Sequence, residues 1–214
     1  MLLTISLPRQ VLCFLGASPR TSQGEAAARV EGIVSAHIDA VWRTARRLGV
    51  ASRDIEDVAQ EVMLVVLRRV DDIELDRERA FVLATTVRVV ANWRRSRRRH
   101  PEELTDCVEQ VVSRAEHYAT QAADNPEQAL ERVRKLELLQ AALHEMTEPQ
   151  QGAFIMFELE QMSAREIARE LQVPEAAIVS RVRRAREVFA RCLARHRQAH
   201  SEAHSNVRER RRGA

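Results

Sequence analysis

The sequence predicts an all-α protein made of two small helical domains joined by a flexible linker. Its 214 residues include only 6 Gly, 6 Pro and 4% aromatic residues, and no long alternating run of β-branched residues is present. Apolar residues instead recur at steps of three and four in several stretches. A chain of this length has room for two compact cores. We expect these domains at residues 27–100 and 126–198, with residues 101–125 as the linker.

Three amphipathic helices are expected in the first domain. The first covers residues 25–48 and ends at Gly49, a residue type that suits the conformation found after a helix. The second begins after Asp54, which is a common N-terminal cap. The third begins near Arg79 and ends just before Pro101, because the residue before a proline is disfavoured in a helix. Each helix has one apolar side that can be buried.

Two charged surfaces lie on these helices. The net charge is only +3, since 34 basic and 31 acidic residues nearly cancel, so the positions of the charges matter more than their sum. The second helix would hold Asp57, Gln60 and Glu61 together on its outer side. The third ends in the strongest positive charge of the chain, formed by Arg94, Arg95, Arg97, Arg98, Arg99 and His100. The acidic patch is suited to a basic protein partner, and the arginines can follow phosphates.

Both surfaces also have simpler interpretations. The acidic patch could be only a solvated helix face, and this is the interpretation that the residues alone favour. The arginine run could be a polybasic surface or a nonspecific RNA tether.

Capping patterns predict the helices of the second domain. A leucine-rich helix begins after Asn125, and Thr147 with Gln150 predicts a capped start for the next helix. Ser163 with Glu166 repeats this pattern, so a further helix is expected to begin there.

The stretch from residue 163 to residue 186 has the layout of a helix-turn-helix. Pro174 lacks an amide hydrogen and ends the first helix, while Gln172 would adopt a left-handed conformation only with some strain. The second helix has an apolar stripe formed by Ile178, Val182, Ala185 and Phe189. Its other side carries Ala176, Ala177, Ser180, Arg181 and Arg184. Small residues followed by arginines suit a helix that enters the major groove of DNA, although a solvated charged face is the alternative.

The remaining features limit location and chemistry. Three distant cysteines, Cys13, Cys107 and Cys192, argue for a reducing cytosol. We expect residues 1–26 to be a disordered extension and residues 199–214 a basic tail. The apolar start has no basic residue before it, and nothing else approaches a membrane span, so no membrane insertion is expected.

The sequence offers one candidate metal site and no candidate active site. Cys192, His196, His200 and His204 follow at four-residue steps and could line one side of a helix to bind zinc. The favoured interpretation is that Cys192 continues the apolar stripe and that the histidines belong to a polar tail. No phosphate-binding glycine loop, paired nucleophile or acid pair is present, so we expect no catalytic residues, no cofactor and no enzyme activity.

Three features together resemble the extracytoplasmic-function (ECF) class of bacterial RNA polymerase sigma factors. They are the residues 56–62 (Glu-Asp-Val-Ala-Gln-Glu-Val), the basic helix of residues 81–99 and the helix-turn-helix of residues 163–186. The resemblance covers residues 27–100, which correspond to region 2 of the family, and residues 126–195, which correspond to region 4. The features have the order and spacing of the family.

The resemblance implies partners and roles for single residues. Asp57, Gln60 and Glu61 would dock on the β′ clamp helices of core RNA polymerase, whose β flap is a second contact. The −10 promoter element would be contacted by Arg88, Asn92, Arg94, Arg95, Arg97, Arg98 and Arg99. The −35 element would be contacted by Ala177, Ser180, Arg181 and Arg184. An anti-sigma factor is a further expected partner.

Some residues depart from the pattern of the family. The loop of residues 71–78 is unusually acidic, and Phe81 stands where tryptophan is common. Val179 replaces a frequent lysine, and Ala176-Ala177 replaces a common glycine-threonine pair.

Two other functions remain open from the sequence. The chain could be a helix-turn-helix transcriptional regulator whose N-terminal helical domain dimerises or senses a ligand. It could also be a helical adaptor that binds only proteins.

Overall fold

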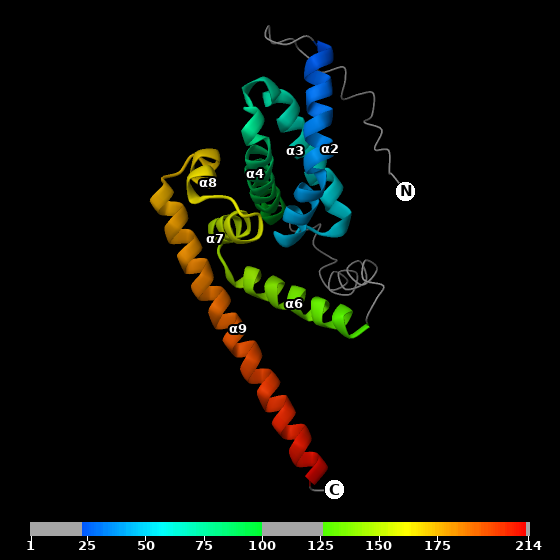
Figure 1. Cartoon of the computed structure of the whole chain (residues 1–214), viewed down its shortest axis with the longest axis vertical. Helices are drawn as coiled ribbons and strands as arrows, with labels where there is room; N and C mark the ends of the chain where they lie inside the picture. Colours follow the sequence, from blue (N-terminus) through cyan, green and yellow to red (C-terminus); the bar gives the residue numbers. More distant parts are fainter. Residues whose placement is uncertain (1–22, 100–125, 213–214) are drawn as a thin grey trace.

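The computed structural model describes residues 23–99 and 126–212, and within these ranges the protein is helical, as predicted. The N-terminal block contains α2 (Gln23–Arg47), α3 (Ile55–Arg69) and α4 (Glu78–Arg99). The C-terminal block contains α6 (Pro126–Glu145), α7 (Glu148–Phe154), α8 (Ala164–Leu171) and α9 (Glu175–Arg212). Figure 1 shows the two blocks side by side, with α9 extending far beyond the rest of the molecule. The expected linker lies outside the described residues.

Helix α3 begins directly after Asp54, as expected, but the Asp54 side chain does not cap it. Gly49 follows α2 with a φ of +85°, which agrees with its predicted role as a stop. Asp54, however, makes no capping hydrogen bond and instead ends a short 3-10 turn, Ser52–Asp54. Its Oδ1 accepts a hydrogen bond from Nη2 of Arg97 in α4 at 2.8 Å. The predicted side-chain cap is absent because Asp54 has near-helical backbone angles, with a φ of −99° and a ψ of −7°, whereas a capping residue has an extended backbone.

Helix α4 is buried on two sides, whereas the sequence pattern predicted one apolar side. Residues 82–86 are consecutive and all buried. Val82 packs in a core formed with α2 and α3 that also includes Phe154 and Ile155 of the C-terminal block. Leu83 packs in a second core with Met156 and Ile167 of that block. The helix therefore lies between the two blocks and forms part of both cores.

The C-terminal block is organised around α9. Phe154 of α7 stacks on Phe189 of α9, with ring centroids 5.6 Å apart. A π-helical turn, Ile155–Leu159, leads from α7 toward α8. The predicted turn between α8 and α9 is present, and Gln172 adopts the left-handed conformation with a φ of 56°. Helix α9 continues to Arg212 and so extends into the segment 199–214 that we expected to be a basic tail.

The predicted capping box of α8 is formed. The Glu166 backbone N–H donates to Ser163 Oγ at 3.2 Å, and the Ser163 backbone N–H donates to Glu166 Oε2 at 2.8 Å. The Ser163 hydroxyl also donates to this carboxylate, and these bonds lower the pKa of Glu166. The box satisfies amide groups that would otherwise lack a partner at the helix start.

We expect Ser163→Ala to lower the free energy of unfolding by about 1 kcal/mol, because it removes the N-terminal cap of α8. Urea denaturation followed by circular dichroism measures this loss. Ser35→Ala is the matched control, since Ser35 is exposed in the interior of α2 and alanine is the better helix former there. Equal stabilities of the two variants would contradict a role for the cap.

Candidate interfaces for a protein partner and for nucleic acid

The acidic patch lies on the solvent-facing side of α3. Asp57, Gln60 and Glu61 are all exposed, at the spacing that places them on one helix face. Val58 and Val62 are almost completely buried and fix the orientation of the helix. The patch is therefore accessible to a partner protein, and its charge opposes an approach of DNA to this face.

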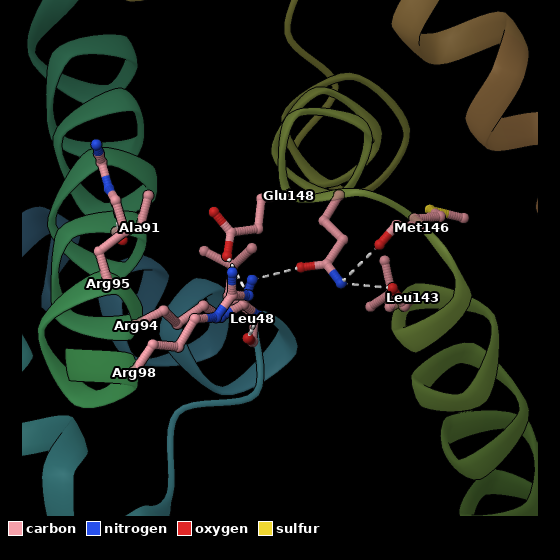
Figure 2. Close-up of polar contacts among 9 residues, drawn as sticks. Leu48, Ala91, Arg94, Arg95, Arg98, Leu143, Met146 and Glu148 are labelled. Atoms are coloured by element: carbon pink, nitrogen blue, oxygen red, sulfur yellow. Dashed lines mark hydrogen bonds and ion pairs between the residues drawn. The ribbon is translucent and has the colours of Figure 1, made fainter. Parts of the chain in front are cut away.

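One arginine of the predicted −10 group connects the two blocks. Arg94 Nη1 donates to Gln151 Oε1 of α7 at 2.8 Å, and Arg94 Nη2 donates to the carbonyl oxygen of Leu48 (Figure 2). Gln151 Nε2 in turn donates to the carbonyl oxygens of Leu143 and Met146, at 2.6 and 3.3 Å. Burial lowers the pKa of the Arg94 guanidinium. In this arrangement Arg94 acts as a bridge between α4, the end of α2 and the C-terminal block.

Two further arginines of this group also bind other parts of the chain. Arg97 is the partner of Asp54, and its guanidinium lies 4.5 Å from the ring centroid of Trp93. Arg98 Nη2 lies 2.8 Å from Glu148 Oε1 at the start of α7, in a more exposed pair (Figure 2). The basic run therefore does not form a single free surface.

Another set of the predicted DNA contacts gathers at one cleft. Arg88, Asn92 and Arg95 lie on one side of α4 and line a cleft of about 400 Å³. Arg181 of α9 lines the same cleft from the C-terminal block. Arg95 Nη2 donates to Asn92 Oδ1 at 2.8 Å, so this pair is preorganised on the helix surface. Arg99 is exposed at the end of α4.

The other predicted contacts of α9 lie near the start of that helix. Ala177 and Ser180 are half-buried, while Arg184 is exposed. Val179, at the position of the frequent lysine, is 54% exposed. Small side chains close to the backbone and a free guanidinium one turn further are compatible with entry into a major groove.

The acidic loop between α3 and α4 contacts the helix-turn-helix. Its Leu75 is 79% exposed, whereas Ile73 is buried. Its Arg77 donates through Nε to Glu170 Oε1 of α8 at 3.1 Å. The loop is thus connected to the other block by an ion pair.

Sequence reasoning missed the carboxylates that join the blocks. Glu160 follows the π-helical turn, is only 4% exposed and pairs with Arg47 of α2 and Arg79 of α4. Glu170 is 7% exposed and pairs with Arg77. The only available signal was a polar residue next to an apolar stripe, and the partners lie 81 to 113 residues earlier in the chain.

The candidate metal ligands do not form a described site. Cys192 is buried and continues the apolar stripe of α9, while His196 is half-buried. The side chains of His200 and His204 lie outside the described part. Among the described side chains, no group of three or more His, Cys, Asp or Glu residues could hold a metal ion. No helix in the same part of the chain is long and apolar enough to cross a membrane.

Comparison with known proteins gives two family matches in the order expected. Residues 33–100 match the family described as Sigma-70 region 2, and residues 136–188 match Sigma-70, region 4. The ECF RNA polymerase sigma factor SigE of Mycolicibacterium smegmatis (strain ATCC 700084 / mc(2)155) is 28% identical over 165 residues, which are 77% of this chain and 61% of SigE. The chain therefore spans about three fifths of the length of this curated relative.

A solved structure has a similar fold. CnrH, in its complex with the cytosolic domain of CnrY, matches with a TM-score of 0.53 and 20% identity. The match covers 79% of this chain and 94% of the CnrH chain. At 20% identity, the match supports a similar fold only.

Proposed function

Because the chain belongs to the ECF group of the sigma-70 family, we propose that it binds core RNA polymerase and directs promoter-specific initiation of transcription. The observation that carries the proposal is the presence of region 2 and region 4 in one chain, with an acidic face on one and basic helices on both. A helix-turn-helix regulator with a dimerising or ligand-sensing N-terminal domain is less favoured, because that part of the chain matches region 2.

The acidic patch of Asp57, Gln60 and Glu61 is the proposed contact with the β′ clamp helices. It is exposed, and it lies on a different helix from the basic surfaces. Opposite charges on the two proteins would guide docking and fix its register. The β flap is the proposed second contact of the polymerase, on the region 4 block.

Promoter contacts are proposed on α4 and α9. Arg88, Asn92 and Arg95 have the geometry to meet the −10 element, since a guanidinium can hold a phosphate and an amide can bond to the edge of an exposed base. Arg94 and Arg97 would support these contacts from within the fold. Arg99 would add a phosphate contact at the helix end.

The −35 element is the proposed target of the start of α9. Arg181 and Arg184 would reach bases or phosphates, and Ala177 and Ser180 would allow the backbone to approach the groove. The protein would open the promoter through binding alone, without a chemical step of its own.

An anti-sigma factor is the proposed inhibitor. CnrH has a similar fold, and its structure was solved in complex with the cytosolic domain of CnrY. This similarity supports a protein partner for this chain as well. Such a partner would compete with polymerase or DNA for the surfaces described above.

The test of the proposed function is run-off transcription with purified core polymerase on a library of randomised promoters. We expect transcripts only when the protein is added, from templates that share two short elements at a constant spacing. Sequence-specific DNA binding without any polymerase-dependent transcript would favour the regulator instead. If the protein binds no DNA at any salt concentration, the adaptor that binds only proteins would be favoured.

We expect Arg184→Ala to weaken binding to the selected upstream element by about 1–3 kcal/mol, if the guanidinium holds a base edge. Fluorescence anisotropy of the full chain with core polymerase and labelled promoter measures the loss. Arg183→Ala is the matched control, because Arg183 is an exposed arginine of the same helix that is not among the proposed DNA contacts. Its Nη1 lies 3.5 Å from Oε1 of Glu187. Equal losses in the two variants would contradict a specific role for Arg184.

A further inference from the structure

A strongly basic cleft of about 400 Å³ lies between α4, the start of α7 and the helix-turn-helix. Cavities of about 300–1,000 Å³ are the usual sites of small organic ligands, so this cleft has room for such a molecule. Among the described lining residues Glu148 is the one carboxylate, and it already pairs with Arg98. The lining contains four arginines, which are Arg88, Arg94 and Arg95 of α4 and Arg181 of α9.

The four arginines of the cleft have no carboxylate partner in the described part of the chain. The hydrogen-bond acceptors of Arg94 and Arg95 are neutral amide and carbonyl oxygens. Within the same ranges, Arg88 and Arg181 form no ion pair. By contrast, the arginines that join the blocks each bind a buried carboxylate. The described residues therefore leave the positive charge of the cleft without a balancing anion.

Partial burial makes this positive charge costly. Burial lowers the pKa of the Arg88 guanidinium, and the charge of Glu170 opposes this change without cancelling it. Burial also lowers the pKa of Arg94, with Glu148 acting in the opposite direction. A cation that loses part of its water without gaining an anion raises the free energy of the folded chain. A bound anion would offset this cost.

The remaining part of the lining is largely apolar. Val87 and Val90 belong to α4, Leu171 and Val173 to the helix-turn-helix, and Pro149 to α7. Apolar walls with a few charged groups are typical of pockets for organic ligands. Guanidinium groups hold phosphates through paired hydrogen bonds. Because a phosphate group carries about −1.5 to −2 charges at pH 7, two such groups balance the four guanidinium groups.

We propose that this cleft is a binding site for a small organic molecule that carries two or more phosphate groups, of the class of nucleoside diphosphates and triphosphates. Arg88, Arg95 and Arg181 hold the phosphates, and the apolar walls contact the organic part. Since Arg88 and Arg181 belong to different blocks, the bound molecule contacts both. This site goes beyond the proposed function, because it needs neither polymerase nor promoter.

The experiment is isothermal titration calorimetry of the full chain with ATP as the probe, without polymerase or DNA. It is done at physiological ionic strength, where exposed charges are screened beyond about 8 Å and nonspecific binding is weak. Inorganic pyrophosphate and adenosine are titrated separately as the two parts of the probe. We expect one ATP per chain, weaker binding of pyrophosphate and no measurable binding of adenosine.

Two single variants on different elements test the site, Arg88→Gln and Arg181→Gln. Each removes a guanidinium without an ion pair, so we expect a normal thermal melt by circular dichroism and about ten- to a hundredfold weaker ATP binding. Arg68→Gln and Arg183→Gln are the matched controls. Both remove the same charge from an exposed arginine that does not line the cleft, so ATP affinity should not change.

Several results would overturn the inference. These are the absence of ATP binding, adenosine binding as tight as that of ATP, and equal losses in the variants and the controls. A further one is binding of single-stranded DNA that depends on Arg88 and Arg181 while ATP does not bind, since the cleft would then be a DNA surface only. Failure of run-off transcription would remove the proposed function and leave an observed ATP site in place.

Discussion

Reversal of two charges on α3, Asp57→Lys with Glu61→Lys, is expected to abolish binding to core RNA polymerase. Both side chains are exposed, so the fold does not depend on them, and lysines would face the basic partner surface proposed for the β′ clamp helices. Like-charge juxtaposition across an interface costs several kcal/mol, and each 1.4 kcal/mol is about a tenfold change in affinity. We therefore expect a loss of at least about a hundredfold.

Affinity for immobilised core enzyme measures this loss, and a thermal melt followed by circular dichroism tests the fold. The matched control is Glu31→Lys with Asp39→Lys, which makes the same change in net charge at two exposed positions on α2. Polymerase binding that survives in the α3 variant would remove the proposed role of the acidic patch. An equal loss in the control would indicate a general effect of charge.

Truncation of Ile178 is expected to produce the largest loss of stability. Ile178 is completely buried at the start of α9, in the core that includes Ile167 of α8 and Leu83 of α4. Ile178→Ala removes apolar contacts and leaves a cavity, and such changes cost about 2–5 kcal/mol. A loss of this size is a large fraction of the stability of an ordinary domain, which is about 5–15 kcal/mol.

The neighbouring residue provides a sharp control. Val179 is 54% exposed on the same turn, so Val179→Ala should change the free energy of unfolding by less than about 0.5 kcal/mol. Urea denaturation of both variants under identical conditions measures the difference. Similar losses at the two positions would mean that the face of α9 turned toward the core is not the one described here.

Local signals explain why most of the helices were predictable. The capping box of Ser163 and Glu166, the stop at Gly49 and the turn at Gln172 all act within a few residues, and each is present in the structure. The stripe that begins at Ile178 is also buried as expected. These features depend on backbone chemistry and helical periodicity, which are properties of a short segment.

Distant contacts explain the differences. Asp54 has the right residue type for a cap, yet it binds Arg97, 43 residues further along the chain. Arg94 belongs to a basic run that resembles a DNA-binding surface, yet it bonds to Leu48 and Gln151. Helix pattern alone cannot reveal such competition, because it carries no information on which side chains approach from other elements.

By itself, the sequence determined that the chain is helical, where most of the described helices begin, and which face of α3 and which stripe of α9 are polar or apolar. Periodicity, caps and turn residues set these features locally. The tertiary structure alone decided which charged groups stay available to partners and which join the two blocks. Glu160 and Arg47 illustrate the reason, since their separation of 113 residues becomes a contact of 2.5 Å only when the blocks pack together.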